Sequence, residues 1–580
     1  MRESIRENIF VLQTGDLLAF STLSPFGAQE SGPKARKAIG DTFVVHYISC
    51  VTNRETRVAL MPAFIAVPIV LPALALLALG LIPSRIANQR AGLFRQAVTG
   101  LVACQLVIVT LMAVFIASGI SPTIAVEFKP LPTLFGIYYD GVAALMLAMV
   151  SAVGWVICRF SIRYLDGESG QGRYFRWTGF TIGAVSLLVV SGNLLMFFGC
   201  WVTTSLGLHQ LLMHYGHRSA ARRAAWTKFA ISRLGDVALM GAIALIYSQF
   251  KTLNFSELFT LSKSVGDASP AMIWAGSLLV LGAITKSAQF PFHTWLPQTM
   301  ETPTPVSALM HAGIVNAGGY LIIRTSPLLQ MAPLALTGLA VVGAITACLG
   351  AVVMLTQTSV KKQLAYSTIA QMGFMMLQCG LGAFSAAMLH ILAHSLYKAH
   401  AFLNSGNVMA QRTSTLATSS ESQPVPWPKL AFASLAIVAC FALAMATVGI
   451  DIAAKPGGLV LGAILCLALT HWVSQAIRIS TDRMLIRVIA TAAMICFVYA
   501  IGFLAVDKTI AASLPEGSVP TMAWLSGSII AAGFAGMFLL QMRLSSRQTS
   551  PLLNRFYVHA TNGFYLEKWE QRVFAPLAKN

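Results

Sequence analysis

The sequence is poor in charged residues. Only 11% of its 580 residues are Asp, Glu, Lys or Arg, and 56% are hydrophobic. Soluble domains carry about 25% charged residues. Apolar runs, each about 20 residues long and able to cross a bilayer, recur along the chain from residue 61 to residue 541. Nothing between these runs is long enough for a soluble domain of useful size. We therefore predict an all-α polytopic membrane protein with about 13–15 transmembrane helices, some of them discontinuous.

The sequence also lacks the motifs of nucleotide and redox chemistry. It contains no G-x-G-x-x-G fingerprint, no Walker A sequence and no iron–sulfur spacing. Its nine cysteines are scattered, without a C-x-x-C pair or a metal-ligand spacing, and we interpret them as small buried hydrophobic residues. We therefore expect no cofactor and no bound metal, and a role other than that of an enzyme.

Acidic residues are scarcer than basic ones. The chain has 21 Asp and Glu against 40 Lys and Arg, a formal net charge of +19. In a soluble protein this excess would suggest nucleic acid. Here the basic residues lie in short connections after the first, third and fifth apolar runs, so these connections should face the cytoplasm and no nucleic acid is expected. The densest of them, Arg218 to Lys228, either only sets this topology or docks a partner.

The N-terminal segment does not fit this topology. Residues 1–60 are polar and basic, yet the charge pattern would place them outside. They form either an extracytoplasmic extension or a poorly structured stretch ahead of a true start at Met61. The remaining expected division is 61–215, N-terminal transmembrane helices; 216–410, ion-translocating core; 411–427, polar loop; 428–545, C-terminal transmembrane helices; and 546–580, C-terminal tail.

Lys286 lies near the end of a long apolar stretch that Pro291 and Pro297 then interrupt. A lysine ammonium group at membrane depth costs several kcal/mol unless it is paired or hydrated. Irregular backbone at that depth survives only where it packs against protein or lines a wet cavity. We therefore predict that Lys286 belongs to an ion path. The alternative is a lysine at a helix end whose ammonium group reaches the interface.

Histidines in apolar surroundings mark two further positions. His311 is expected about two turns into a new helix, where it either continues the ion path or bonds to a neighbouring helix. His390, His394 and Lys398 recur at i, i+4 and i+8, which puts them on one helix face about 6 Å apart per step. Such a column can pass a proton. Structural hydrogen bonding and a metal site, which would need a third ligand, are the alternatives.

Arg233 and Asp236 form the remaining polar pair within an apolar run. At i, i+3 the two side chains can pair and offset the cost of burying each other. They are either a structural ion pair near a membrane face or a pair whose carboxylate biases the charge of Lys286.

Together these residues resemble the antiporter-like membrane subunits of respiratory complex I and of multisubunit cation/proton antiporters. The resemblance is strongest over Ala283–Arg324, continues through Lys361–Thr368 and His390–Lys398, and covers residues 62–405 well. It implies an antiporter-like fold with a polar axis running across the membrane plane.

By this resemblance Lys286 is the central buried lysine on a discontinuous helix and His311 is the next link. The sequence departs from the complex I pattern in two places. Complex I subunits of this type usually carry a Trp-Glu pair whose carboxylate partners the central lysine, but residues 199–212 contain no carboxylate. Their Phe-Ser-Lys-Asp run has no clear match near Asp451.

Residues 203–209 and 228–236 resemble more narrowly the DabB family, the membrane subunits of inorganic-carbon pumps. This resemblance implies a cation-translocating, energy-coupling subunit in the bacterial cell inner membrane. Its implied partner is a soluble, zinc-bearing, carbonic-anhydrase-like subunit of the DabA type on the cytoplasmic side. Lysines and histidines favour the proton over sodium as the coupling ion. The alternatives are a proton-pumping subunit of an NADH:quinone oxidoreductase and a subunit of a Na⁺/H⁺ antiporter.

Overall fold

The structure of the chain is a computed structural model. It describes residues 54–117, 123–127, 135–264, 269–406, 427–450, 456–479, 482–515, 527–528, 530–537 and 551–568. Residues 1–53, residues 411–426 of the expected polar loop, and residues 546–550 and 569–580 of the expected C-terminal tail therefore lie outside the described residues.

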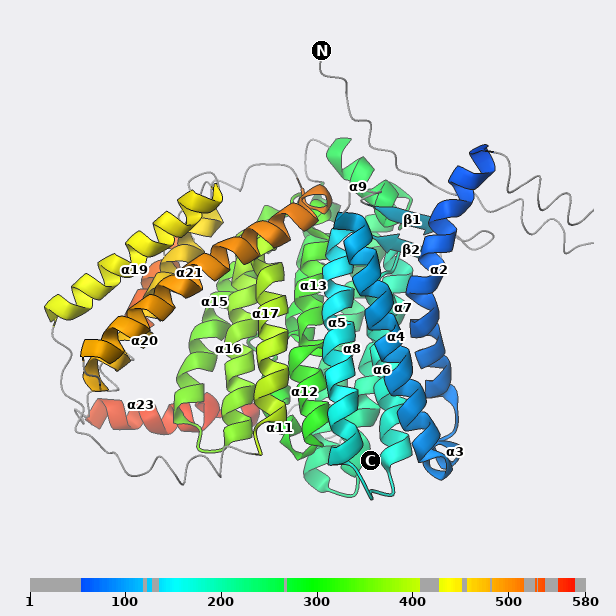
Figure 1. Cartoon of the computed structure of the whole chain (residues 1–580), viewed down its shortest axis with the longest axis horizontal. Helices are drawn as coiled ribbons and strands as arrows, with labels where there is room; N and C mark the ends of the chain where they lie inside the picture. Colours follow the sequence, from blue (N-terminus) through cyan, green and yellow to red (C-terminus); the bar gives the residue numbers. More distant parts are fainter. Residues whose placement is uncertain are drawn as a thin grey trace, which may run out of the picture.

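Long helices crossing a common slab make up the fold (Figure 1). They are α2 (Arg54–Leu81), α4 (Ala91–Ala117), α5 (Gly141–Tyr164), α6 (Gln171–Val189), α7 (Leu194–Leu212), α8 (Ser219–Phe250), α10 (Pro270–Lys286), α12 (Thr304–Ala312) with α13 (Ala317–Arg324), α15 (Pro333–Thr356), α16 (Val360–Gly380) and α17 (Phe384–Leu403). The expected apolar runs between residues 61 and 405 thus each form a helix or a broken helix. Helix α2 begins at Arg54, so its first turns belong to the segment expected to precede the first span.

Three further helices, α19 (Trp427–Val448), α20 (Pro456–Ile479) and α21 (Asp482–Ile510), pack on one another around their own apolar cluster. The end of α21 contributes Val506 and Ile510 to the main core. Helix α23 (Pro551–Thr561) lies across the direction of the bundle beside α15 (Figure 1), and the Thr561 carbonyl accepts a hydrogen bond from Gln357 Nε2 at 3.2 Å.

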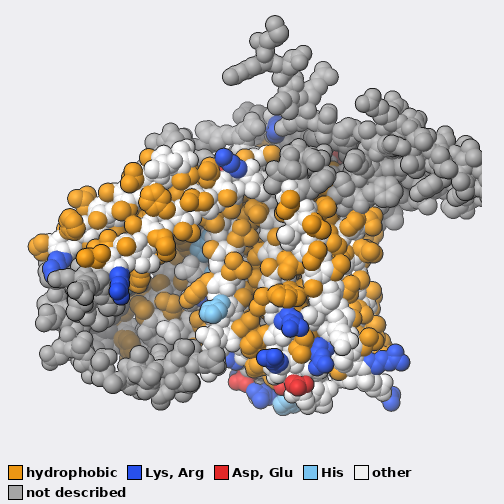
Figure 2. Space-filling view, in the orientation of Figure 1, with side chains coloured by type: hydrophobic (Ala, Val, Ile, Leu, Met, Phe, Trp, Pro, Cys, Tyr) orange, Lys and Arg blue, Asp and Glu red, His pale blue; other side chains and the backbone are white. Residues whose placement is uncertain are grey.

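Eight of the described helical segments are long and apolar enough to cross a membrane, and three shorter helices are apolar as well. Large apolar side chains such as Leu71, Leu111 and Trp274 are exposed on the outside of the bundle, and Figure 2 shows an almost continuous hydrophobic band over it. A protein surface of this kind is stable against lipid chains. The polytopic, all-α membrane class is confirmed, with one small addition: strands β1 (Ile124–Glu127) and β2 (Gly136–Tyr139) pair antiparallel at one end.

The two ends of the bundle differ in charge. One end, which we name the basic end, holds α3 (Ser84–Gln89), η2 (Met213–Tyr215) and the start of α8. On the face drawn in Figure 2, most of the Lys and Arg side chains lie at this end. The other end, the hairpin end, holds β1, β2 and α9 (Phe255–Ser264) (Figure 1). The pattern of basic connections therefore gathers on one side, as the positive-inside rule requires.

A buried ion pair fixes the core near the hairpin end. Asp140 caps α5 by accepting the amide of Ala143 at 2.9 Å, and both of its carboxylate oxygens accept hydrogen bonds from Arg324 at 2.8 and 2.9 Å. Arg324 ends α13, so this pair ties the start of α5 to the end of α13. Bidentate, charge-assisted pairs of this geometry are among the stronger hydrogen-bonded contacts in proteins.

Candidate ion-translocation site

The helix break occurs where the sequence predicts it. Helix α10 ends at Lys286, and the chain then passes through Ser287–Thr294 without regular helix before α11 (Trp295–Gln298), η3 (Thr299–Glu301) and α12. Pro291 cannot donate a backbone hydrogen bond, so the helix does not resume before it. Ser287 Oγ donates to the Val315 carbonyl at 2.6 Å and so ties the break to the gap between α12 and α13. The last side chain of α10, Lys286, therefore points into protein rather than toward an interface.

Lys286 is 5% exposed and its charge is held by one residue of α7. Its Nζ donates to the Trp201 carbonyl at 3.2 Å and lies 4.3 Å from the centre of the Trp201 ring. An ammonium group over an indole face is attracted by the quadrupole of the ring, and more strongly once both are removed from water. A lysine that reaches the interface is excluded by this burial, so the ion-path interpretation of Lys286 has the geometry it needs.

The Arg233–Asp236 pair reaches the same tryptophan. Arg233 Nη2 lies 2.6 Å from Asp236 Oδ2, and Trp201 Nε1 donates to Asp236 Oδ1 at 3.1 Å. Helices α8 and α10 pack closely, with Gly235 facing Thr285: a Cβ at Gly235 would lie 2.2 Å from Thr285 Oγ1. The structure thus joins the buried Asp236, Trp201 and Lys286 and the partly exposed Arg233 into one polar group, which we name the α7–α8–α10 cluster.

Lys228 belongs to this cluster, and the prediction that it lies in a connecting loop is wrong. The segment from Arg218 to Lys228 was expected to be a connecting loop, but α8 begins at Ser219, so nearly all of it is helical. Lys228 is 2% exposed, and its Nζ donates to the Ser205 carbonyl at 2.9 Å and to Ser205 Oγ at 2.7 Å. Lys228, Ser232 and Asp236 recur at i, i+4 and i+8. The same spacing predicts the histidine column on α17. Applied here, it places Lys228 on the helix face of Asp236.

A second polar group lies among α12, α16 and α17. His311 is fully buried, and its ring stacks on Phe402 of α17 with 4.3 Å between centroids. Neither ring nitrogen of His311 has a hydrogen-bond partner among the described residues, and the same holds for Asn316 Oδ1. Buried polar atoms are usually satisfied by protein or ordered water. These three atoms are therefore buried hydrogen-bonding groups that the described residues leave unpaired.

The α17 column is confirmed as one helix face. The rings of His390 and His394 lie 5.9 Å apart, and Lys398 Nζ donates to the Leu364 carbonyl of α16 at 3.2 Å. His394 and Lys398 are 5% and 0% exposed, whereas His400, off this face, is exposed. His394 Nε2 has no partner among the described residues. We name His311 and this column the α12–α17 cluster.

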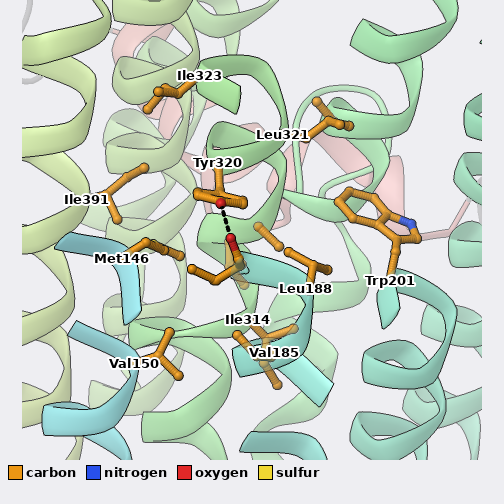
Figure 3. Close-up of a cluster of buried hydrophobic side chains, with 14 of the residues drawn as sticks. Met146, Val150, Val185, Leu188, Trp201, Ile314, Tyr320, Leu321, Ile323 and Ile391 are labelled. Carbon is orange, nitrogen blue, oxygen red and sulfur yellow. Dashed lines mark hydrogen bonds between the residues drawn. The ribbon is translucent and has the colours of Figure 1, made fainter. Parts of the chain in front are cut away.

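Apolar packing separates the two clusters. Figure 3 shows Trp201 of the α7–α8–α10 cluster on one side and Ile391 of α17 on the other, with Tyr320 and Leu188 among the side chains between them. The Tyr320 hydroxyl is used locally, since it donates to the Val189 carbonyl at 2.6 Å. The chain passes from one cluster to the other along the break itself, where Gln289 and His293 are buried and each leaves one polar atom without a partner among the described residues. The sequence analysis did not single out these two residues.

Comparison with known proteins identifies the class to which the fold belongs. Residues 191–450 match the family described as NADH:quinone oxidoreductase/Mrp antiporter, transmembrane, and residues 126–175 match the N-terminus of chain 5 of NADH-ubiquinone oxidoreductase (complex I). Among solved structures, a chain of the Mrp complex from Dietzia sp. matches with a TM-score of 0.57 and 24% identity, covering 88% of this chain and 60% of that one. The fold is that of the antiporter-like membrane subunits.

Curated relatives narrow this class. The probable inorganic carbon transporter subunit DabB2 of Halothiobacillus neapolitanus is 38% identical over 443 residues, which is 75% of this chain and 79% of the relative. DabB of Hydrogenovibrio crunogenus is 43% identical over 266 residues, 51% of its length. Subunit L of NADH-quinone oxidoreductase from Escherichia coli is 39% identical over 277 residues, 45% of its length. The chain belongs to the DabB family of membrane subunits.

Proposed function

We propose that this chain is the proton-translocating membrane subunit of an energy-coupled complex that accumulates inorganic carbon, in a bacterial inner membrane. Two relatives, each 38% identical, are named as probable inorganic carbon transporter subunits. The observation that carries the ion-translocating part is Lys286, a buried ammonium group at a helix break that touches Trp201 and, through it, Asp236. A group of this kind can change its charge in low dielectric while protein dipoles hold it in place.

The residues of the proposed path are Lys286, His311, His390, His394, Lys398, Asp236 and Arg233. Their side chains are amines, imidazoles, one guanidinium and one carboxylate, a set that exchanges protons and offers few of the oxygen ligands that a sodium ion prefers. The chain therefore supplies the energy-coupling path. The chemistry of carbon dioxide and bicarbonate is assigned to a soluble, zinc-bearing, carbonic-anhydrase-like partner of the DabA type.

Replacing Lys286 with Ala tests this proposal. In a strain that depends on the complex for growth at ambient carbon dioxide, Lys286→Ala should abolish growth while the protein stays in the membrane at normal abundance. Lys263→Ala is the matched control, because Lys263 is exposed on α9. Normal growth of the Lys286→Ala strain would refute the proposal.

The partner is proposed to dock at the basic end. Arg222 and Arg223 are exposed on the first turns of α8, the helix that carries Lys228, Arg233 and Asp236. A contact there lies on the same rigid element as the α7–α8–α10 cluster, so it could shift that cluster. Reversing both arginines to Glu should weaken co-purification of the soluble partner without removing the chain from the membrane. Undiminished co-purification would place the docking surface elsewhere, and the two arginines would then serve topology only.

A proton-pumping subunit of NADH:quinone oxidoreductase is the second candidate, because subunit L of Escherichia coli is 39% identical over part of its length. Against it stands α7, Leu194–Leu212, which carries no Asp or Glu to partner Lys286. The two functions differ in one measurement: when respiration is inhibited and a proton gradient is imposed, membranes that contain the complex should take up inorganic carbon, and a protonophore should abolish this uptake.

A further inference from the structure

Lys228 is a buried lysine for which the path described above has no use. It lies nine residues into α8, about 14 Å along the helix from its start at the basic end. Within the described residues, its ammonium group makes two hydrogen bonds, both to Ser205. Removing such a group from water costs several kcal/mol, and an apolar side chain would pack in the same place without that cost.

The two buried lysines bind successive turns of one helix. Lys286 donates to the carbonyl of Trp201, and Lys228 donates to the carbonyl and hydroxyl of Ser205. Trp201 and Ser205 are four residues apart on α7, so their carbonyl groups are about 6 Å apart along its axis. Helix α7 runs from the hairpin end toward η2 at the basic end (Figure 1), which places Lys228 one turn nearer the basic end than Lys286.

Too little negative charge faces these lysines for both to be charged cheaply. Within the described residues, two buried lysines, Lys228 and Lys286, and the partly exposed Arg233 lie near one carboxylate that bonds into the cluster, Asp236. Two ammonium groups that bind neighbouring turns of one helix repel each other, and the repulsion grows as the local dielectric constant falls. The cluster therefore favours the state in which only one of the two lysines carries a proton.

Other titratable groups on the elements packed against α8 are already engaged. His209 of α7 contacts the Ala225 carbonyl through Nδ1 at 3.3 Å. Glu301 of η3 pairs with Arg218 at 3.0 Å, and His214 of η2 contacts Glu168 at 3.4 Å. On these elements, within the described residues, Asp236 is the carboxylate that bonds into the cluster.

We propose that Lys228 is a second proton carrier, which receives a proton from the basic end and hands it to Lys286. In this step an N–H bond at Lys228 Nζ breaks, a new N–H bond forms at the neutral amine of Lys286, and one positive charge moves one turn along α7. A bridging water or the Ser205 hydroxyl spans the gap. The proposal rests on the proposed function, because it requires that protons move through Lys286.

The test uses the complete complex with its soluble partner, in cells and in purified membranes. Lys228→Arg keeps the positive charge and the donors but cannot release a proton at physiological pH. Lys228→Gln keeps donors without charge. Lys251→Gln is the matched control, since Lys251 is exposed at the other end of the same helix. Uptake of radiolabelled bicarbonate is measured over a range of pH, with membrane abundance determined in parallel.

We expect Lys228→Arg and Lys228→Gln each to lower uptake at least tenfold at normal abundance, and Lys251→Gln to behave as the unsubstituted chain. Ser205→Ala leaves Lys228 in place but removes one acceptor of its ammonium group. It should move the alkaline limb of the uptake profile to lower pH, a change that a purely structural role would not produce, and it decides the question if the Lys228 variants fail to insert.

Two results would overturn the role of Lys228. One is Lys228→Arg retaining at least half of normal uptake, because a permanently charged side chain cannot relay a proton. The other is Ser205→Ala leaving the pH profile unchanged. If instead the unsubstituted complex takes up no bicarbonate under a proton gradient, the proposed function fails, and this is visible before any variant is compared.

Discussion

Trp201 forms hydrogen bonds with both Asp236 and Lys286, one through its side chain and one through its backbone. Its indole Nε1 donates to Asp236 Oδ1 at 3.1 Å, and its carbonyl accepts from Lys286 at 3.2 Å. The acid and the lysine are therefore linked through α7 without a direct salt bridge between them among the described contacts. This matters because α7 has no carboxylate of its own. Within the described residues, the negative charge bonded into the cluster therefore comes from Asp236 of α8.

Trp201→Phe tests this link. Phenylalanine keeps an aromatic face beneath Lys286 but removes the donor to Asp236, and losing a hydrogen bond to a charged group costs about 1.5–3 kcal/mol. Inorganic-carbon uptake should fall about tenfold or more at normal membrane abundance. The control is Trp155→Phe, because Trp155 is 39% exposed on the lipid-facing side of α5. Equal uptake in the two variants would show that the indole nitrogen has no part in coupling.

The α17 column gives a comparison within one helix. His394 is 5% exposed and lies between His390 and Lys398, whereas His400 is exposed off that face. His394→Ala should lower uptake at least tenfold, because it removes the titratable ring from the middle of the column. His400→Ala should leave uptake within about twofold of normal, since a surface substitution changes little. If both variants lose uptake equally, the column does not conduct protons.

The buried Asp140–Arg324 pair predicts a stability effect distinct from transport. Arg324→Met strands a carboxylate that is 1% exposed, and breaking such a pair costs about 3–5 kcal/mol. The variant should therefore melt at a lower temperature in detergent and accumulate less in the membrane. Arg218→Met is the contrasting case, because both side chains of the Arg218–Glu301 pair are about half exposed, and surface pairs contribute about 0–1 kcal/mol.

A second substitution sharpens this stability test. Adding Asp140→Leu to Arg324→Met removes the stranded charge, and replacing a buried pair by apolar residues is often neutral. Stability should recover in part. The loss that persists, about 1 kcal/mol, comes from the missing Asp140 cap of α5. A double variant no more stable than Arg324→Met alone would mean that the pair does not stabilise the fold through its charges.

The sequence predicted the membrane class and the break after Lys286 because both depend on local patterns. Apolar runs of spanning length and a Lys followed by two prolines need no knowledge of tertiary contacts. The column of His390, His394 and Lys398 was found in the same way, from helical periodicity. These predictions required only residue type and spacing.

What the sequence did not reveal are contacts between distant segments. Asp140 and Arg324 stand 184 residues apart, and nothing local marks them as partners. In the sequence, the segment around Trp201 differs from complex I by its missing glutamate. Nothing in the sequence indicates that Trp201 links Asp236 to Lys286. The prediction of a loop at Lys228 is wrong because it rests on composition alone. A cluster of basic residues at the start of a helix has the composition of a loop, and only its periodicity shows that it is helical. The hydrogen bonds to Ser205 come from packing of α8 on α7.

Gly235 offers a test of how closely α8 and α10 must approach for the site to work. A Cβ there would lie 2.2 Å from Thr285 Oγ1 and 3.3 Å from Thr285 Cβ. Threonine is stiff at χ1, and its hydroxyl is held by the Gly282 carbonyl at 2.8 Å, so it cannot turn away freely. Gly235→Ala should force the two helices apart at a cost of about 1–3 kcal/mol. Because Lys286 follows Thr285 and Asp236 follows Gly235, uptake should fall about tenfold.

The contact between Gly235 and Thr285 also predicts a second substitution that should restore uptake. Thr285→Ala removes the hydroxyl that the new methyl group would strike, so the Gly235→Ala, Thr285→Ala double variant should recover most of the lost uptake, as coupled neighbours do in a double-mutant cycle. Gly199→Ala on α7 is the control, since a Cβ there meets nothing within 4 Å. Uptake and abundance are measured for the unsubstituted chain, the two single variants, the double variant and Gly199→Ala. If Gly235→Ala is harmless, or if Thr285→Ala fails to rescue it, the spacing of α8 and α10 does not govern the position of Lys286 relative to Asp236.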